Sequence, residues 1–318
     1  MSLPLVSVLI PNFNSNFLVE TLQSVLDQTY ENLEIIIVDD GSTNNSLSDI
    51  NYLKSKKIKV FSQTNKGACA ARNYAFSVCT GDYIQYLDAD DILSLNKIEI
   101  QVEMLKKSSR DAIASCSWVK FKDSPKNTEF QNFEINKDYS DPVNWLIDSW
   151  SGKGVGQTSI WLTPRHIIEK AGEWTEGLSI NQDGEFFSRV LINASQIKYC
   201  ESANVYYRSG NPESVSQSNN KNKLKAEALL SSYMLYEKNI PEYLKNEEVK
   251  KALANNYISF IYHFHPQYPE LLSLAKNKFH ALGFSKMWPQ GGKTFKKIAN
   301  GIGFEKALTL RDKIKFLN

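Results

Sequence analysis

The sequence has few of the residues that build disulfide frameworks and zinc sites. Its 318 residues include four cysteines and four histidines. No two cysteines form a Cys-x-x-Cys pair, and neither residue type shows the spacing of a zinc site. We therefore expect reduced thiols, a cytosolic protein and structural roles for the histidines. The residues concerned are Cys69, Cys79, Cys116, Cys200, His166, His263, His265 and His280.

Long apolar segments are also missing. No apolar run approaches the roughly 18 to 20 residues that span a bilayer. The N-terminus has no basic stretch followed by an apolar one, so we expect neither a membrane-spanning helix nor a signal peptide. No Gly-x-Gly-x-x-Gly follows a predicted strand, which argues against a dehydrogenase.

Net charge is small but unevenly distributed. The formal net charge is +2, yet residues 276–318 contain ten Lys or Arg and two Asp or Glu. This tail therefore carries +8 and the rest of the chain −6. A basic tail suggests an anionic surface partner, and a membrane face is the simplest candidate. A solvated helical face is the alternative.

Apolar runs of strand length alternate with helical patterns over the first 120 residues. The alternation predicts an α/β fold with a mostly parallel sheet covered by helices on both faces. Strands are predicted at residues 6–10, 33–38, 58–62, 83–87 and 112–121. Helices are predicted at residues 17–28, 67–79 and 92–107, with a further polar helix that ends near residue 57.

Polar residues gather where the predicted parallel strands end, which is where such sheets bind ligands. An Asp-x-Asp at the end of a buried strand offers the hard oxygen ligands that Mg²⁺ and Mn²⁺ prefer, usually together with substrate phosphates. The sequence therefore predicts a metal site at Asp88 and Asp90, although a capped strand end is the plainer alternative. The residues at these strand ends are Asn12, Asn14, Asp39, Asp40, Asp88 and Asp90.

Four ordered motifs closely resemble glycosyltransferase family 2. They occupy residues 6–14, 36–42, 65–73 and 87–91. The resemblance is strong over the first 120 residues and weaker to about residue 216. It implies a GT-A fold, which has a Rossmann-like, mostly parallel sheet flanked by helices. It also implies a nucleotide-sugar donor and inversion at the anomeric carbon.

The resemblance further implies which residues bind the donor. Asp40 would contact the nucleobase with Asp39 beside it, although a tight turn with a helix cap explains this pair equally simply. Asp88 would lie near the ribose and the metal, and Asp90 would bind the metal. We expect Asp91 to cap the helix that follows. The other donor-binding candidates are Pro11, Asn12, Asn14, Gly67, Arg72 and Arg208.

The two arginines in this set each have two interpretations. Arg72 faces a donor phosphate or forms a surface ion pair. Arg208 stabilises the diphosphate or pairs within the core. Many family members carry a histidine soon after this arginine, but here none occurs before His263, so we expect no third metal ligand there. Residues 210–219 would order over the donor as a lid.

The catalytic base should come from the second half of the chain. The family carries Glu-Asp at the start of a helix, and Gln182-Asp183 stands at the matching place. Asp183 is therefore the predicted general base, with an ordinary helix cap as the alternative. Glu185 is the second candidate, although the helix dipole alone favours an acid there. Gln182 leaves the role of the family's first acid open.

We expect a GT-A domain at residues 1–220 and a helical, basic extension at residues 221–318. The domain would comprise a nucleotide-binding half (1–120) and an acceptor half (121–220). The extension would lie on the inner face of the membrane, or pack onto the domain or a second subunit.

The predicted activity is metal-dependent, inverting transfer from a nucleotide-sugar, with a UDP-sugar favoured. The acceptor would be a hydroxyl of a saccharide or lipid-linked saccharide in cell-surface polysaccharide or glycolipid assembly, and no nucleic-acid partner is expected. One alternative is a nucleotidyltransferase, although the loop at residues 11–15 lacks the Gly and Lys or Arg that such an enzyme needs. The other is a catalytically inactive nucleotide-sugar-binding scaffold.

Overall fold

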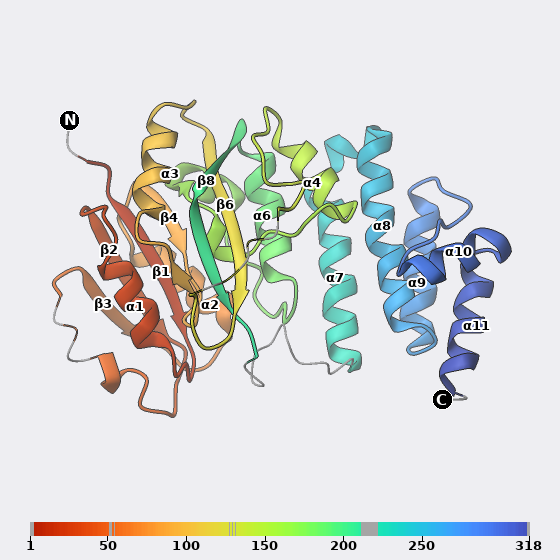
Figure 1. Ribbon diagram of the computed structural model, residues 1–318, viewed down its shortest axis with the longest axis horizontal. Helices are drawn as coiled ribbons and strands as arrows, with labels where there is room; N and C mark the ends of the chain where they lie inside the picture. The colour runs from red at the N-terminus through yellow and green to blue at the C-terminus, as the bar shows by residue number, and fades with distance from the viewer. Residues whose placement is uncertain are drawn as a thin grey trace. The chain divides into compact units, whose positions relative to one another are not determined.

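The computed structural model describes residues 3–50, 53, 55–126, 128, 130, 132–210 and 222–316. The described residues up to 210 form one compact unit, apart from two short segments at 150–152 and 179–181. Those segments belong with residues 222–316 to a second compact unit. Figure 1 shows the order of the elements along the chain.

A five-stranded sheet forms the centre of the first unit, in the order β3-β2-β1-β4-β7. Strands β1 to β4 pair in parallel, and β7 joins the edge antiparallel to β4. β2 is buried along its whole length and β1 along nearly all of it, as their continuous apolar runs predict. The strands are β1 Val6–Asn12, β2 Leu33–Asp39, β3 Ile58–Ser62, β4 Tyr83–Tyr86 and β7 Thr163–Pro164.

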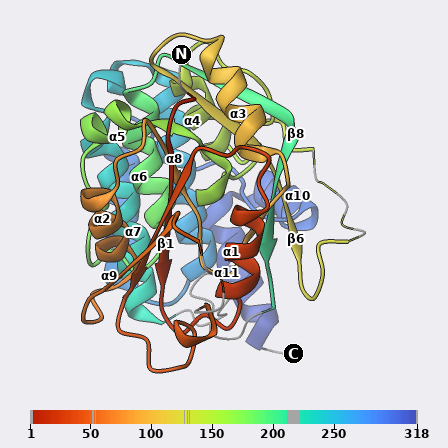
Figure 2. The same ribbon diagram turned by 90° about the vertical axis from the view of Figure 1, so that its left-hand side faces the viewer.

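Helices α1 (Leu18–Leu26) and α2 (Ala68–Val78) lie on opposite sides of this sheet (Figure 2). The strand order explains this, because the chain moves outward from β1 to β3 and then returns past β1 to β4. Right-handed crossovers in opposite directions place their helices on opposite faces. The mostly parallel, doubly covered sheet predicted from the sequence is thereby confirmed for the first four predicted strands, whereas the fifth, at residues 112–121, belongs to a separate sheet.

A second sheet has the order β5-β8-β6 and packs against α3 (Lys97–Lys106). Here β6 and β8 run parallel, with a register irregularity between Cys116 and Ser117, and β5 is antiparallel to β8. The strands are β5 Ile92–Leu93, β6 Ala112–Phe121 and β8 Gln196–Arg208. The remaining helices of this unit are α4 Pro142–Trp150, α5 Arg165–Ala171 and α6 Gln182–Ile192.

The second unit is mainly helical. Its core lies along α8, where Tyr257, Ile258, Phe260 and Ile261 are at most 1% exposed. Within the described parts of the chain, none of the helices combines the length and apolar character needed to span a membrane. The helices are α7 Lys223–Asn239, α8 Glu247–Phe264, α9 Pro269–Ala281, α10 Lys293–Ile302 and α11 Phe304–Phe316.

Two local predictions were wrong. The polar helix expected to end near residue 57 is instead a loop in which the described residues contain one 3-10 turn, Ser48–Ile50. Asp91 does not cap a helix, because it precedes the short strand β5 and α3 begins six residues later with Asn96 as its cap. Asp91 is instead completely buried.

Candidate active site

The first two strands end side by side and exchange side-chain contacts. The register pairs Asn12 with Asp39 and Pro11 with Val38. The Asn12 amide donates to Asp39 Oδ1 (2.9 Å) and to Ser42 Oγ (3.1 Å). Asp39 Oδ2 accepts from the Ser42 amide at 3.1 Å. The predicted donor-binding residues at these two strand ends therefore form one buried polar cluster.

Asn14 organises the loop that follows β2. Its φ of 53° places it in the left-handed region, which asparagine tolerates better than most residues. Its backbone amide donates to Ser42 Oγ (2.9 Å), and its Oδ1 accepts from the Thr43 amide (2.7 Å). Asn14 therefore fixes residues 42–43 against the end of β1.

Asp40 fixes the loop that leads into α2. Its Oδ1 accepts from Gln63 Nε2 (2.7 Å) and the Lys66 amide (2.8 Å), and its Oδ2 accepts from the Gly67 amide (2.8 Å). Gly67 has a φ of 91°, which a residue with a side chain rarely adopts. Each carboxylate oxygen can accept more than one hydrogen bond, so these contacts orient Asp40 without excluding a nucleobase.

Asp88 and Asp90, which follow β4, lie close together, and both are partly buried. The side chain of Asp88 is 29% exposed, and Asp90 is also only partly exposed. Burial and the charge of Asp88 raise the pKa of Asp90 to about 6, against the opposing charge of Arg208. Two neighbouring carboxylates whose charges repel are stabilised by a shared cation.

Asp91 anchors the loop at residues 88–91, called here the carboxylate loop, from within the protein. Its Oδ1 accepts from the Arg208 backbone amide at 3.0 Å, and its Oδ2 accepts from Gln157 Nε2. Burial, followed by the charges of Asp90 and Asp88, raises the pKa of the Asp91 carboxyl well above its usual range. The role of Gln157 could not be found from the sequence, because 66 residues separate it from Asp91.

Arg72 connects the carboxylate loop to the start of α6. Its Nη2 donates to Asp88 Oδ1 at 2.7 Å, and its Nη1 donates to Gln182 Oε1 at 3.0 Å. The guanidinium lies 4.5 Å from the ring centroid of Trp174. Arg72 is only 6% exposed, so its pairing with Asp88 is internal rather than a surface ion pair.

Asp183 lies in the first turn of α6, one residue after the helix begins, and is partly exposed. Its Oδ1 accepts from the amide of Gly184 at 2.9 Å. Burial raises the pKa of Asp183 and the charge of Asp88 adds to this, while the Gly184 hydrogen bond and Arg72 oppose it. A raised pKa suits a general base, because proton transfer is most efficient when the pKa approaches the working pH.

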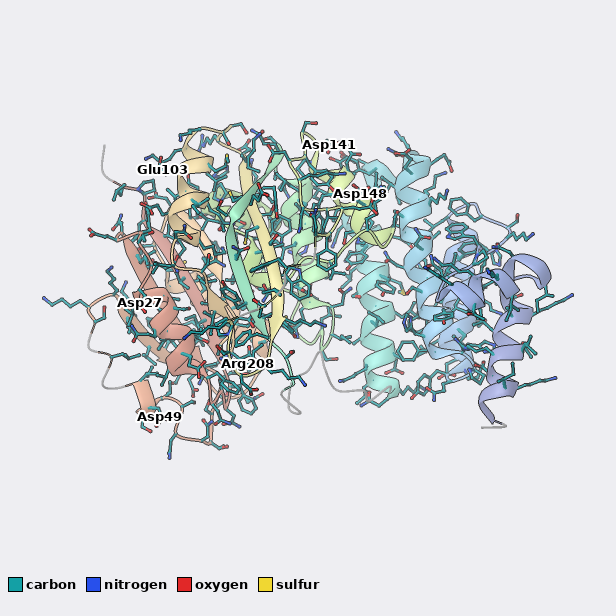
Figure 3. The ribbon with its side chains drawn as sticks, viewed as in Figure 1. Asp27, Asp49, Glu103, Asp141, Asp148 and Arg208 are labelled. Atoms are coloured by element: carbon teal, nitrogen blue, oxygen red, sulfur yellow. The ribbon has the colours of Figure 1, made fainter. Side chains whose placement is uncertain are left out.

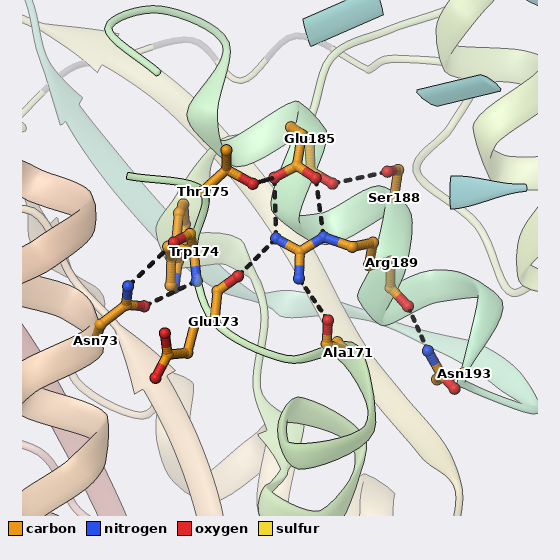
Figure 4. A network of polar contacts seen from close by, with 9 residues as sticks. All are labelled: Asn73, Ala171, Glu173, Trp174, Thr175, Glu185, Ser188, Arg189 and Asn193. Carbon is orange, nitrogen blue, oxygen red and sulfur yellow. Dashed lines mark hydrogen bonds and ion pairs between the residues drawn. The ribbon is translucent and has the colours of Figure 1, made fainter. Parts of the chain in front are cut away.

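Glu185, the second candidate base, is held inside the protein (Figure 4). It is 1% exposed and forms two hydrogen bonds with Arg189, at 2.8 and 2.9 Å. Thr175 Oγ1 donates to the same carboxylate at 3.0 Å. Of these two acids, Asp183 is therefore the better placed for chemistry with a substrate.

Arg208 lies at the end of β8 (Figure 3) and is 3% exposed. Its guanidinium sits 3.9 Å from the ring centroid of Phe17 and 4.5 Å from that of Phe121. It donates to Glu20 Oε2 (2.5 Å) and to the backbone oxygen of Asp90 (3.0 Å). These contacts favour pairing within the core over contact with a diphosphate. Residues 211–219 of the predicted lid lie outside the described residues.

The residues present fit a divalent cation that completes its coordination with substrate. Across the described residues, no group of three His, Cys, Asp or Glu is arranged to hold a metal by itself. Mg²⁺ sites commonly use only one or two carboxylates plus phosphates of the substrate. Asp88 and Asp90, with the raised pKa of Asp90, match that kind of site.

A mostly parallel sheet with these carboxylates at its strand ends is the arrangement expected of a GT-A fold. A crystal structure of Staphylococcus aureus TarS 1–349 in complex with UDP-GlcNAc has the same fold, with a TM-score of 0.73 at 17% identity. The match covers 98% of this chain and 91% of that one. Residues 7–162 match the model of glycosyl transferase family 2. The chain belongs to that family through this domain.

Two curated relatives show how far sequence similarity extends. An uncharacterised glycosyltransferase of Rickettsia felis is 30% identical over 263 residues, which are 81% of this chain and 42% of the relative. Glycosyltransferase GlyG of Streptococcus pneumoniae is 41% identical over 113 residues, 34% of this chain and 38% of the relative. In each case the matched part is less than half the length of the relative.

Proposed function

We propose that the protein is a metal-dependent, inverting glycosyltransferase that moves a sugar from a nucleoside diphosphate donor to an acceptor hydroxyl. One observation carries the proposal: Arg72 joins the carboxylate Asp88 to Gln182, the neighbour of Asp183. A candidate diphosphate site and a candidate base therefore share one buried cation.

Two buried polar atoms support a ligand at this edge of the sheet. Asn12 Oδ1 and Arg72 Nε have no hydrogen-bond partner among the described residues. Buried polar atoms in native proteins are almost always paired. A nucleoside diphosphate offers donors from its base and acceptors from its phosphates, so it can supply both missing partners.

The chemistry assigned to the chain follows from these positions. Asp88 and Asp90 would hold Mn²⁺ or Mg²⁺ together with the donor phosphates, where the ion would supply positive charge to offset the charge on the departing nucleoside diphosphate. Asp183 accepts the proton of the acceptor hydroxyl while its oxygen attacks the anomeric carbon. The bond from that carbon to the phosphate oxygen breaks on the opposite face, which inverts the configuration.

A UDP-sugar is the proposed donor. TarS, which shares the fold, was crystallised with UDP-GlcNAc and with UDP. The test is calorimetry with UDP, GDP, CDP and dTDP, each with and without Mn²⁺. We expect metal-dependent binding of UDP, which Asp90→Ala abolishes. If no nucleotide binds at millimolar concentration with metal present, the donor site is wrong. If UDP binds but no UDP-sugar is turned over with or without acceptor, the protein is an inactive scaffold.

We also propose that the second unit docks on the inner face of the cell membrane, where a lipid-linked saccharide would be the acceptor. On α11, Lys306, Leu310, Lys313 and Ile314 are exposed at the spacing of one helix face. Leu310 is 40% and Ile314 49% exposed. Apolar residues flanked by lysines match the apolar interior and anionic headgroups of a bilayer.

Vesicle flotation tests this docking. The protein should float with vesicles that contain phosphatidylglycerol and remain at the bottom with phosphatidylcholine alone. Replacing Leu310 and Ile314 with serine should weaken flotation, whereas Leu274→Ser on α9, a similarly exposed leucine (39%), should not. A wild-type protein that stays at the bottom with anionic vesicles contradicts the proposal.

A further inference from the structure

Asn181 is held by two hydroxyl groups of α7. Its amide nitrogen donates to Ser232 Oγ at 2.8 Å and to Tyr236 Oη at 2.7 Å. The two hydroxyl residues are four positions apart and so lie on one face of the helix. Ser232 is fully buried and Tyr236 is 3% exposed. All three residues belong to the second compact unit.

The backbone of Asn181 has an uncommon conformation that these contacts hold in place. Its φ is 57°, in the left-handed region, which asparagine adopts more readily than most residues but still uncommonly. Such conformations persist where the surroundings impose them, and they cluster at functional sites. The next residue, Gln182, begins α6, and Asp183 follows it. The angle at Asn181 therefore sets the direction in which the chain enters the helix that carries Asp183.

Further contacts hold the side chains of Ser232 and Tyr236 on α7 in place. Ser232 Oγ donates its own hydrogen to the Leu229 carbonyl at 2.7 Å, so its lone pairs remain to accept from Asn181. The ring of Tyr236 stacks on Trp150, with centroids 4.7 Å apart and planes 29° apart. Tyr236 thus contacts both segments, 150–152 and 179–181, that the second unit takes from the earlier part of the chain.

We infer that Asn181, Ser232 and Tyr236 are positioning residues for the general base, because they fix the backbone two residues before Asp183 in the chain. The inference rests on the proposed function, in which Asp183 is the base. Displacement of a catalytic group by about 1 Å can lower the rate by about 100-fold. A clamp two residues before Asp183 in the chain limits that displacement.

The first measurement is hydrogen–deuterium exchange of peptides covering residues 179–186 in the full chain, which needs no substrate. Asn181→Gly keeps the backbone conformation accessible but removes the amide, and Ser232→Ala with Tyr236→Phe removes both acceptors. Each should raise exchange in this segment. Tyr233→Phe, which removes a hydroxyl from the same helix, is the matched control and should leave exchange unchanged. Unchanged exchange in both clamp variants overturns the inference.

The second measurement is release of UDP from UDP-GlcNAc with Mn²⁺. Both clamp variants should lose about 10- to 100-fold in kcat while their calorimetric affinity for UDP stays at the wild-type value. Adding Tyr236→Phe to Asn181→Gly should cause little further loss, since both changes remove one interaction. Raised exchange with wild-type kcat refutes the positioning role. If Asp183→Asn itself retains activity, the base assignment fails instead, so the two failures are distinguishable.

Discussion

The strongest prediction about stability concerns Lys97, a buried lysine in the first turn of α3. It is fully buried, and its Nζ donates to the neutral amide oxygens of Gln101 (2.6 Å) and Gln85. Burial lowers its pKa from 10.5 to about 8, while the neighbouring thiols of Cys116 and Cys200 oppose this slightly. We predict that Lys97→Met changes how protein stability depends on pH.

The sign follows from proton binding in the two states. Between pH 8 and 10.5 the unfolded chain keeps this proton and the folded chain releases it, so Lys97 makes stability rise with pH. With the two pKa values 10.5 and about 8, linkage gives a destabilisation of about 3 kcal/mol at pH 7 and about 2 kcal/mol at pH 9. Lys97 should therefore contribute an increase of about 1 kcal/mol over this interval.

Urea unfolding of wild type and Lys97→Met at pH 7, 8 and 9 measures this increase as a difference between the two proteins. The comparison is necessary because burial raises the pKa of Cys116 to about 12, and such thiols lower the stability of both proteins at alkaline pH. The methionine also leaves two amide oxygens without their donor, which costs roughly 1–3 kcal/mol each but does not vary with pH. Lys107→Met, at an exposed lysine after the same helix, is the control. A difference that stays constant from pH 7 to 9 refutes the reasoning.

Three further predictions concern the candidate site. Asp183→Asn should lower kcat by about 10²–10⁴-fold and leave UDP affinity unchanged by calorimetry; near-normal turnover contradicts its role as base. Arg72→Met removes a charge that lowers the pKa of Asp183, so the rise of kcat/KM with pH should move to higher pH, and Arg72→Lys should move it less; coincident profiles for wild type and Arg72→Met contradict this. Glu185→Gln breaks the buried pair with Arg189 and should lower the free energy of unfolding by about 1–3 kcal/mol with little change in kcat. A large loss of kcat in folded Glu185→Gln would reopen the choice of base.

The sheet could be predicted from the sequence because its strands depend on local patterns. The runs that became β1 and β2 are apolar and rich in β-branched residues, which suits strands buried on both faces. Parallel order then places their carboxyl ends at one edge. That is why the sequence alone is enough to group Asn12, Asp39 and Asp88.

The positions of Asp91 and Arg208 depend on contacts between distant parts of the chain. Asp91 has an ordinary capping position in the sequence, but its partners Gln157 and Arg208 lie 66 and 117 residues away. Arg208 follows a recognisable motif, yet its position between Phe17 and Phe121 depends on helix α1 meeting the second sheet. No local sequence pattern encodes contacts between such distant segments. Secondary-structure propensity and motif spacing could therefore not assign the positions of these two residues.

Position 182 carries glutamine where the family carries glutamate. The glutamine keeps the contact with Arg72 but lacks the negative charge. The amide oxygen of Gln182 accepts from Arg72 at 3.0 Å, as a carboxylate oxygen at that place could. A glutamate would share the single positive charge of Arg72 among three carboxylates, because Asp88 and Asp183 already draw on it. The neutral glutamine leaves that charge to these two. Arg72 can therefore keep Asp183 ionised more effectively than it could beside a third acid, and the candidate base tolerates the loss of the family's first acid.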